Sequence, residues 1–447
     1  MIAFAAERDL AHRDPAVPGL ATVCDPEAFL AALRRATLAD VRDGQLRYLR
    51  YKVHTLCRAS YRLDVEDEVV DLDVRACRRD DLPALLAEDG AQWLTPGPLG
   101  LGRILLADCA VVITVFPNDL KLPTLRHLVD PDDRALVLQE TLPERPDLWD
   151  GALHGLAYRP ERRYVAEVRP GGSGRSVVLK AYTRRAYTRS KHNATAFASR
   201  GPLRLAALLG CSDARRLIVY DWLPGATLLA AFAAPELERD VVAETGAALA
   251  TLHEQQPKGF PLWTREDEAD AVADVAEEIG FVCPSLARRA ELLAQRIGAE
   301  LASAPPLSSP MHGDFSAAQV LVAPRPGGAS SVAIIDLDGA CCGDPVDDLG
   351  NLLGQAERQV LDGAHTAGWL EEFTESLLDG YSRASGRPLP DRIRLYTAWS
   401  LFRKARLPFR TRAPAWQEST EALVERAGTV ALESGRRRHR EPVSLRQ

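Results

Sequence analysis

The chain has 447 residues, of which 46% are apolar and 26% are charged, and its formal net charge is -7. A chain of this length can bury more than one hydrophobic core, so we expect two or three domains. The mildly acidic balance excludes proteins whose whole surface attracts nucleic acid or an anionic membrane, and we expect neither partner. No signal peptide is evident and no apolar run reaches the ~20 residues of a membrane-spanning helix, so we expect a cytoplasmic protein. Composition leaves the oligomeric state open.

The first 150 residues carry no motif with recognisable chemistry, but they have the pattern of antiparallel strands. Apolar and polar side chains alternate in three stretches: 47–65, 68–78 and 104–122. A strand–turn–strand pattern at 61–77 recurs weakly at 164–182, with Val74 about where the second copy has Lys180. The two stretches are either related modules or two ordinary hairpins. We expect residues 1–150 to form a separate domain.

A second region begins near residue 151. Two predicted strands meet at Arg159 and Pro160, and a third, which ends on VVLK at Lys180, follows a Gly-rich turn. Short strands joined by tight turns predict a small antiparallel sheet. The sequence LIVYDWLPG at 217–225 predicts one more strand that runs into an extended connection.

The remainder of the chain is predicted to be mostly helical. Apolar residues recur at i, i+3 and i+4 in stretches such as ELERDVVAETGAALATLHEQ and GWLEEFTESLLDGYSRAS. Sheets in the N-terminal regions followed by a run of helices predict an α+β fold.

The segment from Met311 to Asn351 interrupts the helices and carries the most informative residues. Two apolar runs predict the strands of a hairpin: 320–322 and 332–335. The ends of a hairpin that are far from its turn lie side by side, so Gln319 and Asp336 are expected to meet. A carboxylate and an amide oxygen at this point, with Asp314 five residues upstream of Gln319, suit a hard cation such as Mg²⁺.

These residues also form a set of motifs. HGDFSAAQ resembles the catalytic loop HGDxxxxN of the aminoglycoside phosphotransferase and choline kinase superfamily, and IIDLDGA resembles its metal-binding IDxD segment. GDPVDDLGN resembles the GDPxxDLA stretch that follows in the same superfamily. Gln319 replaces the usual Asn, as in maltokinase-like members, whose loop reads HGDxHxxQVL. Order, spacing and apolar flanks all match.

The resemblance implies a bilobal protein-kinase-like fold with an N-terminal cap. Residues 1–150 would be an α/β cap domain, 151–223 the N-lobe and hinge, and 224–447 the helical C-lobe. The implied function is an ATP-dependent, magnesium-dependent phosphotransferase that phosphorylates a hydroxyl of a small molecule. A sugar, aminosugar or aminocyclitol is the expected substrate class.

The resemblance also assigns roles to single residues. Asp314 would be catalytic, as acceptor of the hydroxyl proton. Metal ligands would be Gln319 and Asp336, with Asp338 either a further ligand or a turn-forming residue. Among the expected nucleotide-binding residues, the strand lysine Lys180 would contact the phosphates. The hinge residues Asp221, Trp222 and Leu223 would receive the adenine. Arg159 and Arg162 occupy the turn where the usual Gly-rich loop is absent. Three other polar residues of the segment are expected to be structural: His312, Asp344 and Asp348.

One departure from the superfamily leaves alternatives open. Residues 181–212 contain no Asp or Glu, so Lys180 lacks the glutamate that usually holds it. Either another carboxylate, with Asp336 the natural candidate, orients Lys180, or it contacts phosphate unassisted. The departure also allows a catalytically weak nucleotide-binding regulator, a pseudokinase, although retention of Asp314 and Gln319 argues against it.

An aminoglycoside-resistance kinase is the other alternative. Such an enzyme would need an acidic pocket for cationic drugs. Three glutamates of one predicted helix could supply it, but they fit an ordinary solvated helix face equally well: Glu371, Glu372 and Glu375.

Overall fold

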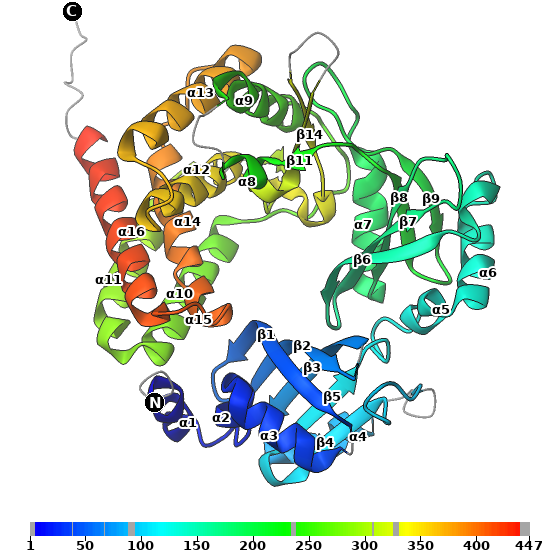
Figure 1. Ribbon diagram of the computed structural model, residues 1–447. Helices are drawn as coiled ribbons and strands as arrows, with labels where there is room; N and C mark the ends of the chain where they lie inside the picture. Colours follow the sequence, from blue (N-terminus) through cyan, green and yellow to red (C-terminus); the bar gives the residue numbers. More distant parts are fainter. Residues whose placement is uncertain are drawn as a thin grey trace, which may run out of the picture. The chain divides into compact units, whose positions relative to one another are not determined.

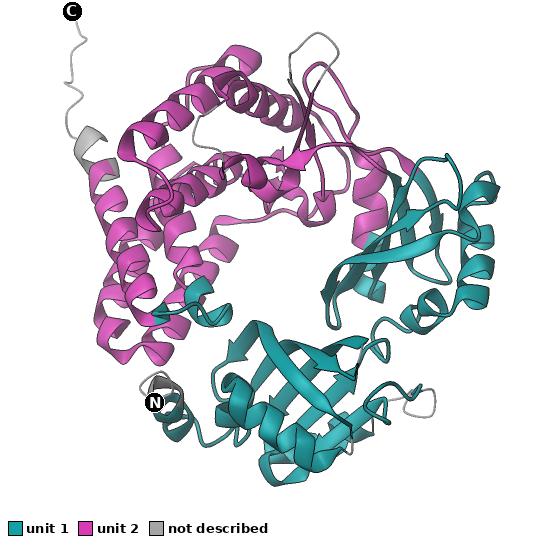
Figure 2. Ribbon diagram, viewed as in Figure 1, with its two compact units in different colours: residues 1–188, 209–221, 407–416 teal, residues 189–208, 222–406, 417–447 magenta. Residues whose placement is uncertain are grey.

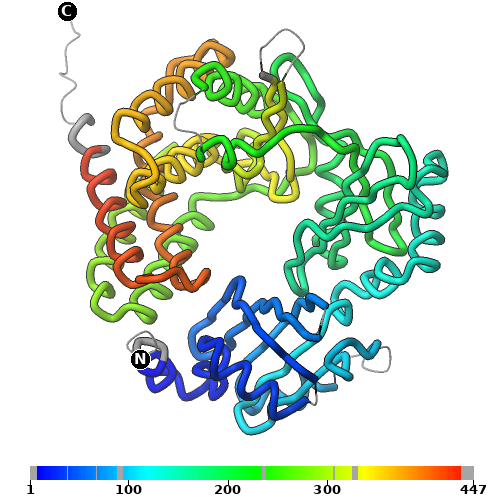
Figure 3. The backbone as a smooth tube through the Cα atoms, viewed as in Figure 1, coloured from blue at the N-terminus to red at the C-terminus, as the bar shows by residue number. Residues whose placement is uncertain are grey.

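A computed structural model describes residues 5–37, 39–66, 68–87, 94–233, 238–305, 308–324 and 330–438. The chain divides into two compact units (Figure 2). Unit 1 comprises residues 1–188, 209–221 and 407–416, and unit 2 comprises residues 189–208, 222–406 and 417–447. The chain therefore passes between the units several times, as the backbone trace in Figure 3 allows the reader to follow.

The first sheet of unit 1 has five antiparallel strands in the order β1-β2-β3-β5-β4 (Figure 1). The strands are β1 (Val41–Lys52), β2 (Leu56–Val65), β3 (Glu68–Cys77), β4 (Arg103–Leu106) and β5 (Val111–Val115). The alternation predicted for these stretches is confirmed. The sheet is accompanied by short helices: α1 (Ala5–Arg13), α2 (Leu20–Cys24), α3 (Pro26–Ala36) and α4 (Leu82–Leu86).

Helix α3 begins where the sequence supplies a cap. The side chain of Asp25 accepts a hydrogen bond from the amide of Ala28 at 3.1 Å, and Pro26 occupies the first helical position, where no amide hydrogen is needed. The helix buries Phe29, whose ring stacks on Tyr61 of β2 with 4.1 Å between centroids. Packing of α3 on β1 and β2 thus closes one face of the first sheet.

The second sheet of unit 1 has the order β6-β7-β8-β10-β9. Its strands are β6 (Ala152–Arg159), β7 (Arg163–Arg169), β8 (Val177–Tyr182), β9 (Leu208–Ser212) and β10 (Leu217–Asp221), and the three strands predicted from residue 151 are confirmed. Two helices, α5 (Leu125–Val129) and α6 (Pro131–Thr141), contribute buried side chains to the core of this sheet. Helix α7 (Arg184–Ala196) follows β8.

Both sheets of unit 1 have one topology: three consecutive strands, a helix, and two strands that add in reversed order. Val74 of β3 pairs with Ala59 and Ile113, whereas Lys180 of β8 pairs with Val165 and Ile218. The two stretches that resemble each other in sequence therefore occupy the second and third strands of sheets with the same order. This favours related modules over two unrelated hairpins.

Unit 2 is mostly helical and contains two small sheets. A three-stranded sheet has the order β11-β13-β14, and β12 pairs with β15. The strands are β11 (Ala226–Thr227), β12 (Ser309–Met311), β13 (Val320–Pro324), β14 (Ser330–Ile334) and β15 (Cys341–Gly343). The helices are α8 (Leu228–Ala231), α9 (Arg239–His253), α10 (Arg265–Val282), α11 (Ala287–Ala302), α12 (Val346–Leu361), α13 (Ala367–Ser385), α14 (Ile393–Lys404) and α16 (Trp416–Arg438).

The core of unit 2 joins α9, α12 and α13 to the hairpin β13–β14. Helices α9 and α13 lie side by side (Figure 1), with Gly246 and Gly380 at their contact. A short helix that follows α14, α15 (Leu407–Arg410), belongs to unit 1. Among the described helices, none combines the length and the apolarity needed to span a bilayer. The α+β, protein-kinase-like fold class is confirmed.

Candidate active site

The loop that follows β12 carries the HGD motif. Gly313 has a φ of +79°, and a Cβ at this position would lie 2.5 Å from the carbonyl oxygen of Gly339. Only glycine fits this backbone without strain, because both the left-handed conformation and the close approach exclude a side chain. The glycine of the motif is therefore needed to bring the loop against the turn that contains Asp338.

Asp348 of α12 fixes the start of this loop. Its carboxylate accepts hydrogen bonds from the amides of His312 at 2.6 Å and Gly313 at 3.0 Å, and His253 Nε2 lies 3.0 Å from the same group. Burial alone would raise the pKa of Asp348, but these hydrogen bonds and the charge of His253 outweigh it and lower the pKa. The expectation that Asp348 is structural is confirmed, although the residue anchors the loop rather than capping a helix.

Two more side chains of α12 hold the rest of the loop. Asn351 Nδ2 donates to the carbonyl of Phe315 at 2.6 Å, and Gln355 Oε1 accepts from the amide of Ala317 at 2.9 Å. Asp348, Asn351 and Gln355 are three and four residues apart, so they share one face of the helix. The backbone on both sides of residue 314 is thus held by two buried polar side chains, Asp348 and Asn351, and by the half-buried Gln355.

Asp314 itself is exposed at the tip of this loop. Within the described part of the chain, its carboxylate makes no hydrogen bond and no ion pair. His312 instead turns inward, where it is buried and its Nε2 lies 2.9 Å from the carbonyl of Ile335. The inward position of His312 is that of a structural residue, but its buried Nδ1 has no hydrogen-bond partner among the described residues, so the ring is only partly satisfied. Asp314 is left as the exposed carboxylate of the HGD motif.

The predicted metal ligands lie around the hairpin β13–β14. Val320 pairs with Ile334, and the amide of Ile335 donates to the carbonyl of Gln319 at 2.9 Å, so the predicted hairpin is confirmed. Its mouth joins Gln319 to Ile335, the residue before Asp336. Asp336 adopts a left-handed conformation with a φ of +67°, which is uncommon for residues other than glycine and found more often at functional sites. Asp338 is buried in the turn that follows.

The donor set fits a magnesium ion. In the described ranges, no three His, Cys, Asp or Glu side chains are grouped so as to hold a metal by themselves. Mg²⁺ does not need such a group, because it usually keeps several waters and takes one or two carboxylates plus substrate phosphates. The side-chain oxygen of Gln319 accepts a hydrogen bond from the hydroxyl of Ser316, which restricts the orientation of the amide.

Lys180 lies in the middle of the second sheet of unit 1. It is buried between the neighbouring strands, and its ammonium lies 5.5 Å from the centre of the Tyr220 ring. A lysine at the end of a strand motif is usually exposed, so burial in a sheet separates Lys180 from an ordinary surface residue. The cation–π contact with Tyr220 was not foreseen from sequence.

The other predicted nucleotide-binding residues are distributed over two places. Arg159 and Arg162 lie at the tight turn between β6 and β7, where the amide of Arg162 donates to the carbonyl of Arg159 at 3.0 Å. Asp221 ends β10 and forms an ion pair with Arg175 at 3.3 Å. Trp222 and Leu223 follow as half-buried residues, and the division between the units falls after Asp221.

Lys404 is a half-buried polar residue near the loop, and sequence patterns did not reveal it. It is the last residue of α14, and its ammonium donates to Asn351 Oδ1 and to Ser400 Oγ, the latter at 2.7 Å. Burial and the charge of Arg403 lower the pKa of Lys404 to about 7, although the carboxylates of Asp314 and Asp347 act in the opposite direction. A lysine in the last turn of a helix normally faces solvent, so no sequence pattern indicated that Lys404 is withdrawn from solvent.

Asp344 is also more than a helix cap. Its carboxylate accepts from the amide of Val346 at 3.2 Å and forms buried ion pairs with Arg265 at 2.8 Å and Arg392 at 3.0 Å. The structural role expected for Asp344 is confirmed, and the two arginines join α10 and α14 to the start of α12.

The model of the phosphotransferase enzyme family matches residues 161–396, just over half of the chain. The chain belongs to the phosphotransferase enzyme family. The matched residues include Lys180 and the whole segment from Met311 to Asn351, whereas residues 1–160 lie outside the match. The protein is therefore a phosphotransferase that acts on hydroxyl groups of small molecules.

Solved structures of similar fold include a protein from Ralstonia eutropha JMP134 provisionally described as an aminoglycoside phosphotransferase. Its identity to this phosphotransferase is 14%, the TM-score is 0.50, and the alignment covers 69% of this chain and 98% of that one. Choline kinase from Cryptosporidium parvum is 10% identical with a TM-score of 0.47, covering 68% and 96%. A mutant of aminoglycoside phosphotransferase APH(4)-Ia in complex with ADP and hygromycin B is 17% identical with a TM-score of 0.47, covering 68% and 98%. No curated protein matches the chain.

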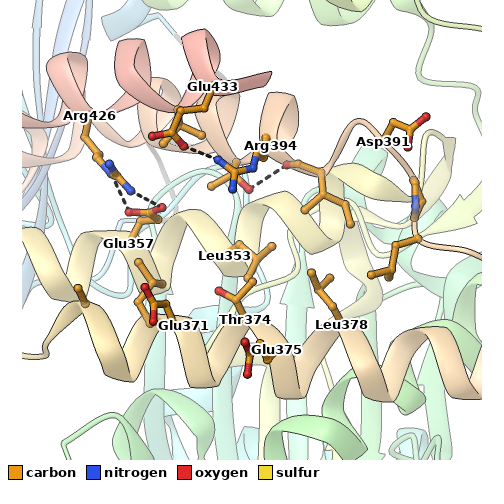
Figure 4. A pocket seen from close by; sticks show the side chains of 17 residues that line it. Leu353, Glu357, Glu371, Thr374, Glu375, Leu378, Asp391, Arg394, Arg426 and Glu433 are labelled. Carbon is orange, nitrogen blue, oxygen red and sulfur yellow. Dashed lines mark hydrogen bonds and ion pairs between the residues drawn. The ribbon is translucent and has the colours of Figure 1, made fainter. Parts of the chain in front are cut away.

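Unit 2 of this phosphotransferase also contains a groove of about 770 Å³ between α12, α13, α14 and α16 (Figure 4). Glu371 and Glu375, two of the three glutamates considered for an acidic pocket, line it, whereas Glu372 pairs with Arg239 at 2.8 Å. Figure 4 shows Glu357 in a double contact with Arg426, so part of the acidic lining is neutralised within the groove.

The groove and the HGD loop use different faces of α12. Leu353 and Glu357 line the groove, whereas Asp348 and Gln355 hold the loop. At about 100° per residue, the two sets lie roughly half a turn apart around the helix. The groove is therefore separate from the exposed carboxylate of Asp314.

Proposed function

We propose that this phosphotransferase transfers the terminal phosphoryl group of ATP to a hydroxyl of a sugar, aminosugar or aminocyclitol. The observation that carries the proposal is Asp314, an exposed carboxylate on a loop in which side chains of α12 hold backbone groups on both sides of it. Phosphoryl transfer requires mainly positioning and charge stabilisation, and a carboxylate fixed in this way suits the positioning of a hydroxyl.

In this mechanism Asp314 accepts a hydrogen bond from the substrate hydroxyl, orients its oxygen and receives its proton as the phosphoryl group is transferred. Gln319 and Asp336, with Asp338 as a further ligand, would hold Mg²⁺, which would neutralise charge on the phosphates. Lys180 would contact the phosphates as a point charge. Backbone groups of Asp221, Trp222 and Leu223 would receive the adenine.

Two alternative functions are less well supported. A regulator without turnover would have no need for an exposed Asp314 on a rigid loop, even though Lys180 has no glutamate partner in 181–212. An aminoglycoside-resistance kinase would need its acidic pocket beside the reacting hydroxyl, but the groove with Glu371 and Glu375 lies on the other face of α12.

The test is a substrate screen followed by one substitution. Purified protein is assayed for ATP consumption with a panel of sugars, aminosugars, aminocyclitols and aminoglycosides. With the best substrate, Asp314→Asn is expected to lower kcat by ~10² to 10⁴ while nucleotide affinity stays unchanged, because the amide accepts no proton. The isosteric change preserves the loop, so an Asp314→Asn variant that turns over at the wild-type rate would rule out the role assigned to Asp314.

A further inference from the structure

Three arginines form a row across the first sheet of unit 1. Arg50 of β1 lies opposite Arg58 of β2, and Arg58 lies opposite Arg75 of β3. Side chains directly opposite each other have Cβ atoms about 5 Å apart, and like charges in that arrangement are destabilising. A row of three positive charges therefore needs acceptors.

Two members of the row are neutralised by acidic residues. Arg58 donates to Asp73 at 2.6 Å and to Glu161 at 2.8 Å, and Arg75 also pairs with Glu161. Burial would raise the pKa of Glu161, but the arginines outweigh it and lower the pKa. The single carboxylate of the β6–β7 turn is thus fully used by the row.

The same turn brings further positive charge to the row. Glu161 lies between Arg159 and Arg162, so its ion pairs place these two arginines beside Arg50. Desolvation and the positive charges of Arg50, Arg159 and Arg163 lower the pKa of Arg162, in agreement with the position that the Glu161 ion pairs give to this turn beside the row.

Three arginines of this group, Arg50, Arg159 and Arg162, have no carboxylate partner among the residues that the structure describes. Arg50, Arg159 and Arg162 are exposed, and within the described ranges none of their guanidinium groups has a hydrogen-bond acceptor or an ion-pair partner. Holding like charges together at the surface is unfavourable, and a polyanion bound there would reverse the sign of the interaction. Guanidinium groups are well suited to this because they bind phosphate oxygens in a bidentate manner.

We propose that Arg50 of the N-terminal sheet and Arg159 and Arg162 of the β6–β7 turn form a phosphate-binding site, whose ligand is the polyphosphate of the nucleotide. The identification of the ligand as a nucleotide rests on the proposed function. The new element is Arg50, because it gives the N-terminal region, which lies outside the matched family domain, a direct part in binding the phosphates.

The test compares three probes by calorimetry at low salt: ATP, tripolyphosphate and adenosine. Arg50→Ala is expected to weaken ATP and tripolyphosphate about tenfold, the effect of one lost charge-assisted contact, and to leave adenosine unchanged. Arg50→Glu should weaken both anions further. Arg47→Ala is the control, because it removes the same charge from the same strand. Arg47 is exposed, and among the described residues its side chain bonds to Gln45 alone, so the affinities of Arg47→Ala for ATP and tripolyphosphate should stay within about twofold of wild type.

The outcomes separate this inference from the proposed function. Equal affinities of wild type, Arg50→Ala and Arg47→Ala for both anions would overturn the site. If Arg50→Ala loses tripolyphosphate binding, and wild type binds ATP no more tightly than tripolyphosphate, the phosphate-binding site would be supported but its assignment to a nucleotide would be contradicted. Thermal unfolding should be unchanged in Arg50→Ala, since the side chain is exposed; a lowered Tm together with equal losses for all three probes would mean a structural role and would also overturn the proposal.

Discussion

The residues that hold the backbone of the HGD loop are not the residue that can react: the former lie on α12, and the latter, Asp314, lies in the loop. Asp348, Asn351 and Gln355 hydrogen-bond to loop amides and a loop carbonyl, whereas the carboxylate of Asp314 makes no hydrogen bond to the residues that the structure describes. A carboxylate that is already saturated by protein donors would be a poor partner for a substrate hydroxyl. Because other side chains hold the loop and the carboxylate of Asp314 stays available, Asp314 is supported as the reactive group.

The two proposed metal ligands, Gln319 and Asp336, are expected to differ in importance. Asp336→Ala should weaken Mg²⁺-dependent nucleotide binding more than Gln319→Ala does, because an anionic oxygen contributes more to a hard cation than a neutral amide oxygen. Titration of Mg²⁺ at fixed nucleotide concentration measures both variants. Equal losses, or a larger loss for Gln319→Ala, would show that the ligand set is wrong.

Lys404 makes a prediction about pH. Its pKa is lowered from 10.5 to about 7 in the folded protein, so between these values the unfolded chain binds a proton that the native protein does not. Stability should therefore rise with pH from about 7 to about 10.5, and the penalty for charging Lys404 should be fully present below pH 7. A shift of this size corresponds to a few kcal/mol, on the order of 1.4 kcal/mol per pKa unit.

The contribution of Lys404 is isolated by comparison with Lys404→Met. The variant should be more stable than wild type below pH 7, and the difference in the free energy of unfolding should shrink as pH rises toward 10. Asn351 Oδ1 keeps the hydrogen bond from Ser400 at 3.1 Å, so the substitution leaves the acceptor satisfied. Urea unfolding of both proteins across this pH range provides the measurement, and a difference that does not vary with pH would contradict the prediction.

At the scale of elements, the sequence pattern predicted those features that depend on neighbouring residues, namely strands and hairpins. The strands of both sheets and the hairpin β13–β14, whose mouth brings Gln319 to the residue before Asp336, follow from alternation and from the geometry of a hairpin. The position of Lys404 does not, because Asn351 lies 53 residues earlier in the chain and only the packing of α14 on α12 brings the two together. Residues 407–416 follow a long helical stretch yet belong to unit 1, where Arg410 donates to Tyr48 at 3.3 Å, and no local signal indicates this.

The contact between α9 and α13 gives a prediction in which tertiary packing opposes helix propensity. A Cβ at Gly380 would lie 1.9 Å from the carbonyl oxygen of Ala243, so Gly380→Ala must push the helices apart. We expect a loss of about 1 to 3 kcal/mol, the usual cost of overpacking. Gly298→Ala in α11 is the matched control, because a Cβ there meets nothing within 4 Å and the substitution should stabilise by about 0.5 to 1 kcal/mol.

Denaturant unfolding of the two glycine variants decides between the effects. If both substitutions changed stability in the same direction, the close approach of α9 and α13 would be wrong. If Gly380→Ala lowers and Gly298→Ala raises the free energy of unfolding, then Gly380 is required by the close contact of the two helices and not by backbone flexibility.

At the scale of the whole molecule, unit 1 contains two sheets with the same strand order, but of the two only the second has a lysine at the strand position where the family resemblance implies a phosphate contact. Where β8 has Lys180, β3 has Val74, a buried apolar residue. The N-terminal sheet therefore contributes through its surface, by the arginine row, and not through the position used by the strand lysine. Its role as a cap, expected from sequence, stays a prediction that truncation can test.

The core of the second sheet predicts where such a truncation must begin. Seven buried apolar residues that precede residue 150 pack in this core: Leu122, Leu125, Leu128, Val137, Leu138, Leu142 and Leu148. A chain that starts at 151 would lose them and expose the apolar side chains of β7, β8 and β10. At about 1.5 to 3 kcal/mol for each buried side chain, the loss reaches roughly 10 to 20 kcal/mol, as much as the whole stability of a typical domain.

We therefore expect residues 151–447 to aggregate, and residues 119–447, which keep α5 and α6, to fold with lowered stability. The longer chain also keeps Asp119, which accepts hydrogen bonds from Tyr158 at 3.1 Å and from the amide of Glu161 at 2.6 Å and so holds the β6–β7 turn. Solubility, circular dichroism and thermal unfolding of the two truncated chains provide the comparison. Equal solubility and Tm would mean that α5 and α6 do not belong to the core of the second sheet. A folded 119–447 chain that binds adenosine like the full chain, but binds ATP and tripolyphosphate as weakly as Arg50→Ala does, would place the contribution of the N-terminal sheet in its phosphate contacts.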